Sequence, residues 1–307
     1  MTVTWDDDID DIITGDAAVG FASVTPSRGV VTMPMAPLGL RDRETGTVTI
    51  TTSLGLPKKL ARLRKNPSVA LAYHAREHGF SSSSLYVVLQ GTAAVDPKPD
   101  RDWLESITPE WERFLGPRHT GPLGRLMDIY YWQRVAIRIQ VSRVLVYDGT
   151  SALPRVIGDD LPAVEPPSQS APTGGTGPRV DTGEVAAHLE RLPHSLLGWV
   201  GSDGLPMVAR VRGIGADEGG VRLVSSDGQL PAGDRRAGLT SHSFSRHMVG
   251  QEQRVHTGWL EVDGNEATYA PHTKAGHAIP RSRTLFAVGA GIGMRPGYKR
   301  AKKLGLA

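Results

Sequence analysis

Residues 48–67 read VTITTSLGLPKKLARLRKNP and join an apolar, β-branched run to a basic one. The first part, Val48–Thr52, is rich in residues that favour a strand. The last part, Pro57–Lys65, has proline in its first turn and ends before the pair Asn66–Pro67, which predicts a short basic helix. The segment therefore predicts a strand, a loop that contains Gly55, and a helix with lysines at its start.

This junction has the groups that hold a phosphate. Thr51, Thr52 and Ser53 place three hydroxyls at the strand end, and Lys58 and Lys59 stand in the first helical turn. A helix N-terminus favours anions, hydroxyls donate hydrogen bonds, and lysine supplies a point charge. The loop is not a P-loop, because no Gly-Lys-[Ser/Thr] triplet follows it. A solvated basic helix explains the same residues, and the pattern alone favours that interpretation.

The rest of the first half, residues 1–148, alternates short β-type runs with turn residues. Inserted helices are expected at Asp7–Ile13, Pro99–Leu115 and Leu123–Tyr131. This mixture predicts a small β-barrel of the α+β type. Further strands are expected at Val19–Val24, Val30–Met35, Val69–Tyr73, Leu85–Val95, Val135–Val141 and Arg143–Tyr147.

Residues 149–181 are rich in proline and glycine and are interpreted as a linker. Residues 182–307 repeat the first half weakly, in three ordered matches at offsets of 173, 168 and 167 residues. These offsets predict a degenerate tandem duplication, although any two β-rich halves share some strand and turn patterns. The matches pair Val221–Ser226 with Val48–Ser53, Leu239–His242 with Leu71–His74, and Gly258–Asp263 with Gly91–Asp96.

The second half departs from the first in its loops and its end. After Ser226 only the Gly-broken loop Asp227–Arg236 stands where the first half has its basic helix. Leu285–Val288 is expected to be a strand, and Gly289–Met294 a turn-rich tail that precedes Pro296. The basic C-terminus is interpreted as a frayed tail, with contact to an acidic ligand as the alternative; its cations are Arg295, Lys299, Arg300, Lys302 and Lys303.

Several of these motifs occur together in a known order. Leu63–Pro67 reads LRKNP, Val69–Tyr73 is a strand, and the strand Tyr86–Val95 carries Gly91–Ala93, which reads GTA. With the Ser/Thr-ended strand, this set resembles the flavin/deazaflavin oxidoreductases with a pyridoxamine 5′-phosphate oxidase-like split β-barrel. The resemblance covers residues 10–147 well and 184–270 only faintly. It implies a mainly β (α+β) fold: two tandem split β-barrels with short inserted helices, paired as a pseudo-dimer within one chain.

The resemblance also implies a cofactor, which we expect to be the deazaflavin coenzyme F420, with FMN as the alternative. The clustered cations favour F420, which carries a phosphodiester and an acidic tail. One site is expected, with the second barrel as its supporting wall. By position, the phosphate would be held by Thr51, Thr52, Ser53, Lys58, Lys59 and Arg62. The floor under the ring system would be Thr32, Met33 and Pro34, with proline at a strand edge.

The implied function is an oxidoreductase that transfers a hydride to a small unsaturated or quinone-like substrate. The alternatives are an FMN-dependent pyridoxamine-phosphate-oxidase-like enzyme, a cofactor-binding carrier without turnover, and a relic without cofactor. Tyr73, His74 and His78 are candidate proton donors, and none is preferred. The aromatic residues of the inserted helices are interpreted as core, with a lid over the cofactor as the alternative: Trp103, Trp111, Tyr130, Tyr131 and Trp132.

Composition narrows the remaining classes. The chain has 307 residues, no cysteine and a net charge of +3, so no disulfides and no Cys-bound metal are expected. The pairs His242 and His247, and His272 and His277, are five apart, which does not suit a helical metal pair. The mixed charge does not favour nucleic acid. With an acidic N-terminus and no long apolar run, a cytoplasmic protein without a membrane partner is expected, and it could form a homodimer.

Overall fold

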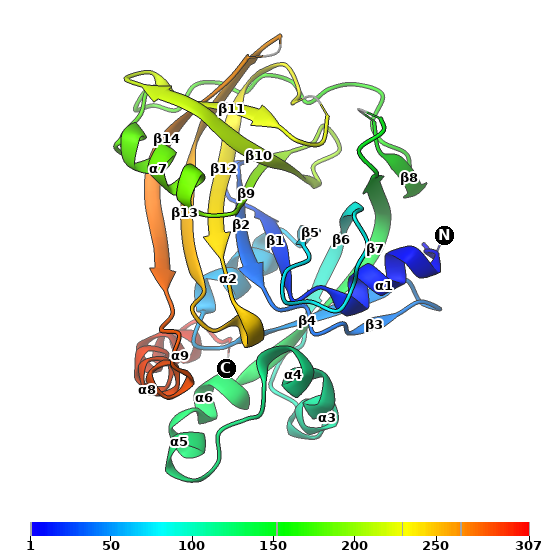
Figure 1. Cartoon of the computed structure of the whole chain (residues 1–307), viewed down its shortest axis with the longest axis vertical. Helices are drawn as coiled ribbons and strands as arrows, with labels where there is room; N and C mark the ends of the chain where they lie inside the picture. Colours follow the sequence, from blue (N-terminus) through cyan, green and yellow to red (C-terminus); the bar gives the residue numbers. More distant parts are fainter. Residues whose placement is uncertain (1, 152, 229, 265, 307) are drawn as a thin grey trace.

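The computed structural model describes residues 2–151, 153–228, 230–264 and 266–306. The architecture is mainly β with short helices, as expected (Figure 1). The first half contains α1 (Asp7–Gly15), β1 (Ala18–Val24), β2 (Val30–Met35), β3 (Arg41–Asp42), β4 (Thr47–Ser53), α2 (Pro57–Lys65), β5 (Ser68–Ala75), β6 (Tyr86–Val95), α3 (Arg101–Ser106), α4 (Thr108–Leu115), α5 (Gly121–Leu126), α6 (Asp128–Tyr131), β7 (Arg134–Tyr147) and β8 (Arg155–Gly158). The second half contains α7 (Thr182–Arg191), β9 (His194–Val200), β10 (Pro206–Asp217), β11 (Gly220–Ser225), β12 (Gly233–Ser243), the 3-10 turn η1 (Arg246–Met248), β13 (Glu252–Asp263), β14 (Glu266–Ala278), α8 (Arg283–Gly293) and α9 (Arg295–Lys303).

The two halves share one strand order. The first sheet runs β2-β1-β5-β6-β7-β4-β3, with β8 paired to β7, and the second is the closed barrel β10-β11-β14-β13-β12-β9. When β1 is aligned with β9 and the strands are followed in turn, β2-β1-β5-β6-β7-β4 corresponds to β10-β9-β12-β13-β14-β11. A helix precedes the first strand in each half, α1 before β1 and α7 before β9. This shared order supports the expected tandem duplication.

The halves differ in how their sheets end. In the second, β10 pairs with β11 and closes the ring. In the first, the equivalent strands β2 and β4 stand apart on an open path. The expectation of two split barrels is therefore met only in part, because one sheet is a closed ring and the other is not. The helix α2 follows β4, whereas residues 226–228 and 230–232, which follow β11, contain no helix.

The two sheets pack against each other through a shared apolar core. Ala22, Val30 and Val88 of the first half pack with Leu196 and Val208 of the second. Burial of each valine or leucine side chain contributes about 1.5–3 kcal/mol, which makes this interface a part of the fold. A glycine allows the closest approach, because a Cβ at residue 238 of β12 would lie 2.1 Å from the carbonyl oxygen of residue 30.

Equivalent residues of the two halves meet in this interface. Nε2 of His74 on β5 lies 2.7 Å from Nε2 of His242 on β12. These residues are 168 apart, the offset that aligns Leu71–His74 with Leu239–His242 in the sequence. Equivalent groups touch each other where a two-fold axis relates two copies. The contact is the one that an intrachain pseudo-dimer would make.

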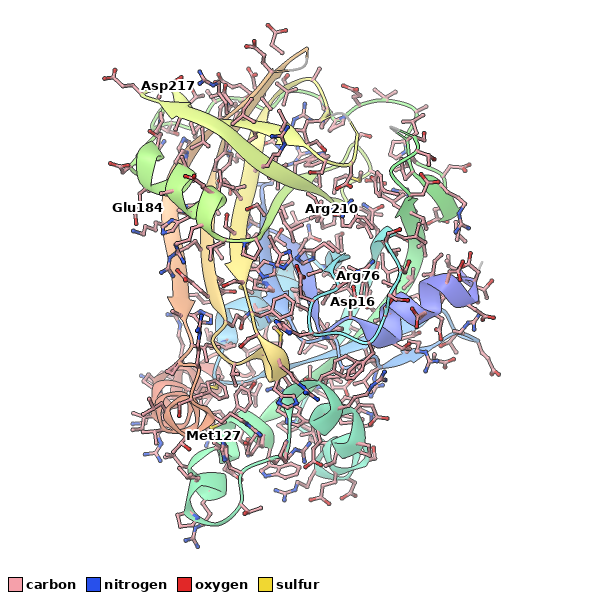
Figure 2. All side chains as sticks on the ribbon, viewed as in Figure 1. Asp16, Arg76, Met127, Glu184, Arg210 and Asp217 are labelled. Carbon is pink, nitrogen blue, oxygen red and sulfur yellow. The ribbon has the colours of Figure 1, made fainter. Side chains whose placement is uncertain are left out.

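Buried polar groups tie other elements together. Asp16, which follows α1, is fully buried and forms an ion pair with Arg76 after β5, and both are labelled in Figure 2. Across the interface, the hydroxyl of Tyr86 donates to the carbonyl of Val208 at 2.7 Å. Arg143 pairs with Asp203 at 2.9 Å. The contacts of Tyr86 and Arg143 fix the relative placement of the two sheets, whereas the pair of Asp16 and Arg76 acts within the first half.

Several expected elements differ from those observed. Leu285–Val288 is helical, within α8, and the basic C-terminus forms the helix α9 instead of a frayed tail. The two strands expected at the end of the first half form one strand, β7, and the helix expected at Pro99–Leu115 is divided into α3 and α4. The predicted linker contributes β8 to the first sheet and then crosses the surface, where the side chain of Gln169 donates to the carbonyl of Arg28 at 3.0 Å.

None of the helices in the described part of the chain has the length and hydropathy needed to cross a bilayer.

Candidate functional site

A cavity of about 790 Å³ lies between the two halves. Its volume is in the range of small-molecule sites, about 300–1,000 Å³. The first half contributes residues of β2, β4, α2, α4, α6 and β7, and the second half contributes residues of η1, β13 and β14. The helices α8 and α9 complete the wall. The cavity therefore occupies the region where the first sheet leaves β2 and β4 apart.

Eight of the nine predicted cofactor residues line this cavity. The exception is Thr32, whose side chain points away. A Cβ at Gly198 would lie 3.0 Å from the Thr32 hydroxyl, and Thr240 donates to the Thr32 carbonyl at 2.8 Å, so Thr32 belongs to the interface between the halves. The eight predicted residues that line the cavity are Met33, Pro34, Thr51, Thr52, Ser53, Lys58, Lys59 and Arg62.

Lys59 is the most unusual of these residues. Its side chain is buried, with 5% exposed, and its ammonium group donates to Sδ of Met35 at 2.8 Å. Burial, together with the charges of Arg134 and Arg62, lowers its pKa to about 7. No ion pair neutralises it among the described residues. A buried ammonium without a counter-ion is unfavourable, so the site favours an anion that would restore its charge.

Arg134 lies beside Lys59 at the start of β7. Its Nε donates to the hydroxyl of Thr51 at 2.9 Å and its Nη1 to the carbonyl of Tyr130 at 3.0 Å. Burial lowers the pKa of Arg134 to about 10, which still leaves it charged at neutral pH. Arg62 is half-buried, and its Nη1 donates to the hydroxyl of Ser23 at 3.2 Å. The guanidinium groups thus have neutral partners only.

The three hydroxyls at the end of β4 are not equivalent. Thr51 accepts from Arg134, and Ser53 donates to the carbonyl of Ile129 at 3.0 Å and accepts from the backbone N–H of Gly55 at 3.1 Å. Thr52 is 1% exposed, and its hydroxyl has no hydrogen-bond partner among the described residues. A buried, unpartnered hydroxyl is unfavourable by about 1–3 kcal/mol. Thr52 is therefore the hydroxyl available to a ligand.

The lysine and arginine side chains on the cavity wall give it a positive charge. No aspartate or glutamate of the described residues lines it. Clustered charges of one sign with low-dielectric walls attract a ligand of the opposite sign. The cations on the wall are Lys58, Lys59, Arg62, Arg134, Arg283 and Arg300.

Apolar and aromatic side chains make up much of the remaining wall. Met33, Pro34 and Met35 come from β2, and Trp111 and Tyr130 from the inserted helices. The rings of Trp111 and Tyr130 meet edge to face, with centroids 5.7 Å apart. Such a wall suits a flat apolar group. Trp111, Tyr130 and Tyr131 are packed in a helical core, as expected, and they also line the cavity. Trp103 and Trp132 do not line it.

The residues of the second half that line the cavity were not identified from the sequence. Gln253 of β13 lies with its Nε2 3.0 Å from Nδ1 of His277 of β14, and both line the cavity. His247 and Met248 also line it, and their φ angles of 61° and 55° lie in the left-handed region. Non-glycine residues in that region are strained and occur often at functional sites. These φ angles could not be predicted from the sequence, and only the structure shows that His247 and Met248 line the cavity.

The three candidate proton donors lie outside the cavity. Tyr73 is fully buried in the core of the first half, and burial raises the pKa of its phenol. His74 lies between the halves, where burial lowers its pKa to about 3. His78 contacts Phe244, with ring centroids 5.9 Å apart. The histidines that do line the cavity are His119, His247 and His277.

Within the described ranges, no group of three or more His, Cys, Asp or Glu residues is placed to hold a metal ion.

Comparison with known proteins gives structural similarity only. No family model and no curated protein sequence matches the chain. A conserved hypothetical protein from Mycobacterium tuberculosis matches with a TM-score of 0.35 and 20% identity, over 48% of this chain and 86% of that chain. General stress protein 26 from Bacillus anthracis matches with a TM-score of 0.33 and 16% identity, over 50% and 96%. An F420 reductase matches with a TM-score of 0.31 and 18% identity, over 44% and 94%. A protein described as a putative pyridoxamine 5′-phosphate oxidase from Listeria innocua matches with a TM-score of 0.31 and 18% identity, over 46% and 95%. The similarity to each of these solved structures extends over about half of this chain.

Proposed function

We propose that this chain binds the deazaflavin coenzyme F420 in the cavity between its halves and acts as an oxidoreductase on a small unsaturated or quinone-like substrate. The observation that supports this most is the buried group of Lys59, Arg62 and Arg134, which has no neutralising carboxylate among the described residues. A phosphate would neutralise it. FMN, which also has a phosphate and a flat ring system, is the alternative.

The residues present fit such a cofactor. The free hydroxyl of Thr52 and the ammonium of Lys59 are the donors for a phosphate oxygen. Arg62 and Arg134 add charge that cannot be lost at neutral pH, because arginine stays protonated. The apolar side chains of Met33 and Met35 would lie against a ring system.

The number of cations favours F420 over FMN. Lys59, Arg62 and Arg134 suffice for one phosphate. Lys58 and Arg300 line the same cavity from α2 and α9, which leaves positive charge for the further acidic groups that F420 carries. A ligand with a single phosphate would leave these two without a partner.

The bound cofactor would supply a hydride to an electron-poor carbon of the substrate. The chain's own residues bind and orient it and keep water away from its ring, since the wall there is largely apolar and aromatic. The imidazoles of His119, His247 and His277 line the wall, and a proton could be exchanged at one of them. A carrier function without turnover uses the same binding residues.

A parallel fluorescence titration with F420 and FMN tests the proposal. Tight binding of F420 with weak binding of FMN is the expected result, and the reverse preference would assign the chain to the FMN alternative. A panel of quinones and unsaturated compounds, tested for oxidation of the reduced coenzyme, then separates an enzyme from a carrier. Binding of neither cofactor would refute the proposal.

A further inference from the structure

Exposed apolar side chains gather at one corner of the molecule. Large apolar residues with at least a third of their surface exposed number nine in the described part of the chain, and five of them lie in α8, directly after α9 or directly before α2. Leu285 is 62% exposed and Ile292 is 56% exposed. With Val288 they are spaced at i, i+3 and i+7 on α8, which places them on one helical face. The five are Leu56, Leu285, Val288, Ile292 and Leu304.

The same corner is strongly basic. Residues 45–76, which include α2, and residues 267–306, which include α8 and α9, contain no aspartate or glutamate. In Figure 1, α8 and α9 lie together at the lower left, and α2 lies beside them; the core contact of Tyr298 and Ala301 with Leu60 and Leu63 joins α9 to α2. The exposed cations of α2 and α9 are Lys58, Arg64, Lys65, Arg295, Lys299, Arg300, Lys302 and Lys303. We refer to this region as the α2–α8–α9 surface.

We infer that the α2–α8–α9 surface binds the surface of an anionic lipid bilayer. Exposed apolar side chains grouped on one face of a helix mark an interaction site, and the cations on the neighbouring helices select a partner of negative charge. An amphipathic helix that inserts apolar side chains at the headgroup boundary, with basic residues around it, is the physical description of interfacial membrane binding. This inference replaces the expectation of no membrane partner for this one face.

Other occupants fit less well. A second copy of the chain would bring two surfaces of the same sign together. A nucleic acid would contact the cations, but would leave Leu285, Val288 and Ile292 without an apolar partner. An anionic bilayer takes up both kinds of side chain at once.

The surface adjoins the cavity. Leu56 and Lys58 at the start of α2, and Met294 and Pro296 between α8 and α9, line the cavity wall. The start of α9 is pressed against this wall, because a Cβ at Gly297 would lie 1.9 Å from the carbonyl oxygen of Gly55. A lipid-soluble substrate, such as a quinone with an apolar tail, would then reach the cavity from the bilayer. That last step rests on the proposed function, whereas bilayer binding does not.

Vesicle co-sedimentation of the full chain without cofactor tests the inference. The probes are vesicles of phosphatidylcholine alone and of phosphatidylcholine mixed with phosphatidylglycerol. Binding to the mixed vesicles, weakened by salt, with little binding to phosphatidylcholine alone, is the expected result. The triple variant Lys299→Glu, Lys302→Glu, Lys303→Glu should weaken binding by roughly a hundredfold or more, because each cation near an anionic bilayer contributes about fivefold and reversal adds repulsion.

A second variant separates bilayer insertion from charge attraction. Leu285→Ser with Ile292→Ser should weaken binding about tenfold through the loss of buried apolar area. Lys98→Glu and Ile214→Ser, exposed on other parts of the surface, are the matched controls and should not change binding. The substituted residues of the two test variants do not line the cavity, so F420 titration of the same variants reports both folding and the proposed function separately.

Three results would overturn the inference. They are equal binding to both kinds of vesicle, binding that survives Leu285→Ser with Ile292→Ser, and a single-stranded DNA oligonucleotide bound more tightly than the mixed vesicles.

Discussion

The first half keeps its strands β2 and β4 apart, whereas the second half joins the equivalent strands β10 and β11 into a closed ring. In the first half, the sequence that follows β4 forms α2, and a cavity with buried cations lies there. In the second half, the loop that follows β11 has no helix within residues 226–228 and 230–232, and the ring closes. One strand order thus occurs with a cavity and buried cations in the first half and with a closed ring in the second half. Among the described residues, the helix α2, which carries Lys59, is one of the elements that only the first half has at this position.

The largest expected effect on this contrast comes from the buried lysine of α2. Lys59→Ala should weaken F420 binding by about 1–3 kcal/mol, because a charged hydrogen bond to the ligand is lost. Fluorescence titration measures the change. Arg64→Ala on the same helix is the control: Arg64 is exposed and does not line the cavity, so its variant should bind as the wild type does. Equal losses in the two variants would show that α2 acts only through its overall charge.

The pKa of Lys59, lowered to about 7 by burial, predicts a pH dependence of binding. An anionic ligand binds the protonated form, so affinity should fall by up to about tenfold per pH unit above pH 7. Titrations at several pH values measure this slope. The slope should disappear in Lys59→Ala, and a steep slope that persists there would place the titrating group elsewhere.

The lowered pKa of Lys59 also predicts how the folding stability of the ligand-free protein depends on pH. Between pH 7 and the ordinary lysine pKa, the unfolded chain binds more protons at this residue than the folded chain. The contribution of Lys59 to folding stability therefore becomes less unfavourable as pH rises through that interval. Lys59→Met should be more stable than the wild type near pH 7, with the difference shrinking toward pH 10. Urea denaturation at each pH measures it, and a variant less stable than the wild type at pH 7 would contradict the account.

An effect on folding stability and not on the binding residues themselves is expected where α9 meets the loop before α2. Gly297→Ala would place a Cβ 1.9 Å from the carbonyl of Gly55, and overpacking of this kind destabilises by about 1–3 kcal/mol. The matched control is Gly289→Ala in α8, where a Cβ meets nothing within 4 Å, and where the higher helix propensity of alanine should stabilise slightly. Urea denaturation compares the two. Similar stabilities would show that α9 shifts freely on α2.

The smallest effect compares equivalent hydroxyls of the two halves. Thr52→Ala removes the unpartnered hydroxyl of β4 and should weaken F420 binding by about 0.5–1.5 kcal/mol. Ser225→Ala removes its counterpart on β11, by the alignment of Val48–Ser53 with Val221–Ser226, and should leave binding unchanged. A calorimetric titration resolves the difference. A loss in Ser225→Ala would indicate a contribution from the closed barrel.

Local sequence patterns were sufficient to predict β4 and α2, the two elements that carry the predicted phosphate-binding residues. The bounds of α2 were predicted correctly, because Pro57 in the first turn and the pair Asn66–Pro67 at the end act within the segment itself. The strand ending in Thr51, Thr52 and Ser53 was likewise predicted from its β-branched residues. The phosphate-binding candidates therefore come together on one wall largely because they are close in the sequence.

The wall from the second half could not be predicted in this way. Gln253 and His277 reach the cavity only because the two sheets pack face to face. Thr32 was assigned to the cavity by position, and its side chain instead packs against the second half. Residues far apart in the chain share a site through tertiary packing, which no local pattern encodes.

The helix α8 was also missed for a physical reason. Its sequence contains three glycines from Gly289 to Gly293, each of which disfavours a helix by about 1 kcal/mol relative to alanine. Packing compensates for this: a Cβ at Gly291 would lie 2.5 Å from Cγ of Leu126, so glycine there lets α8 lie close to α5. Tertiary contact here outweighs local propensity.

The stoichiometry of F420 binding tests the central claim most directly. We would titrate the purified chain calorimetrically and count the sites per chain, with Lys59→Ala in parallel. The account predicts one site per chain, weakened in Lys59→Ala. Two sites per chain, or a single site with the same affinity in Lys59→Ala, would contradict it, because the closed barrel of the second half would then bind the ligand, or the buried cations of the first half would not.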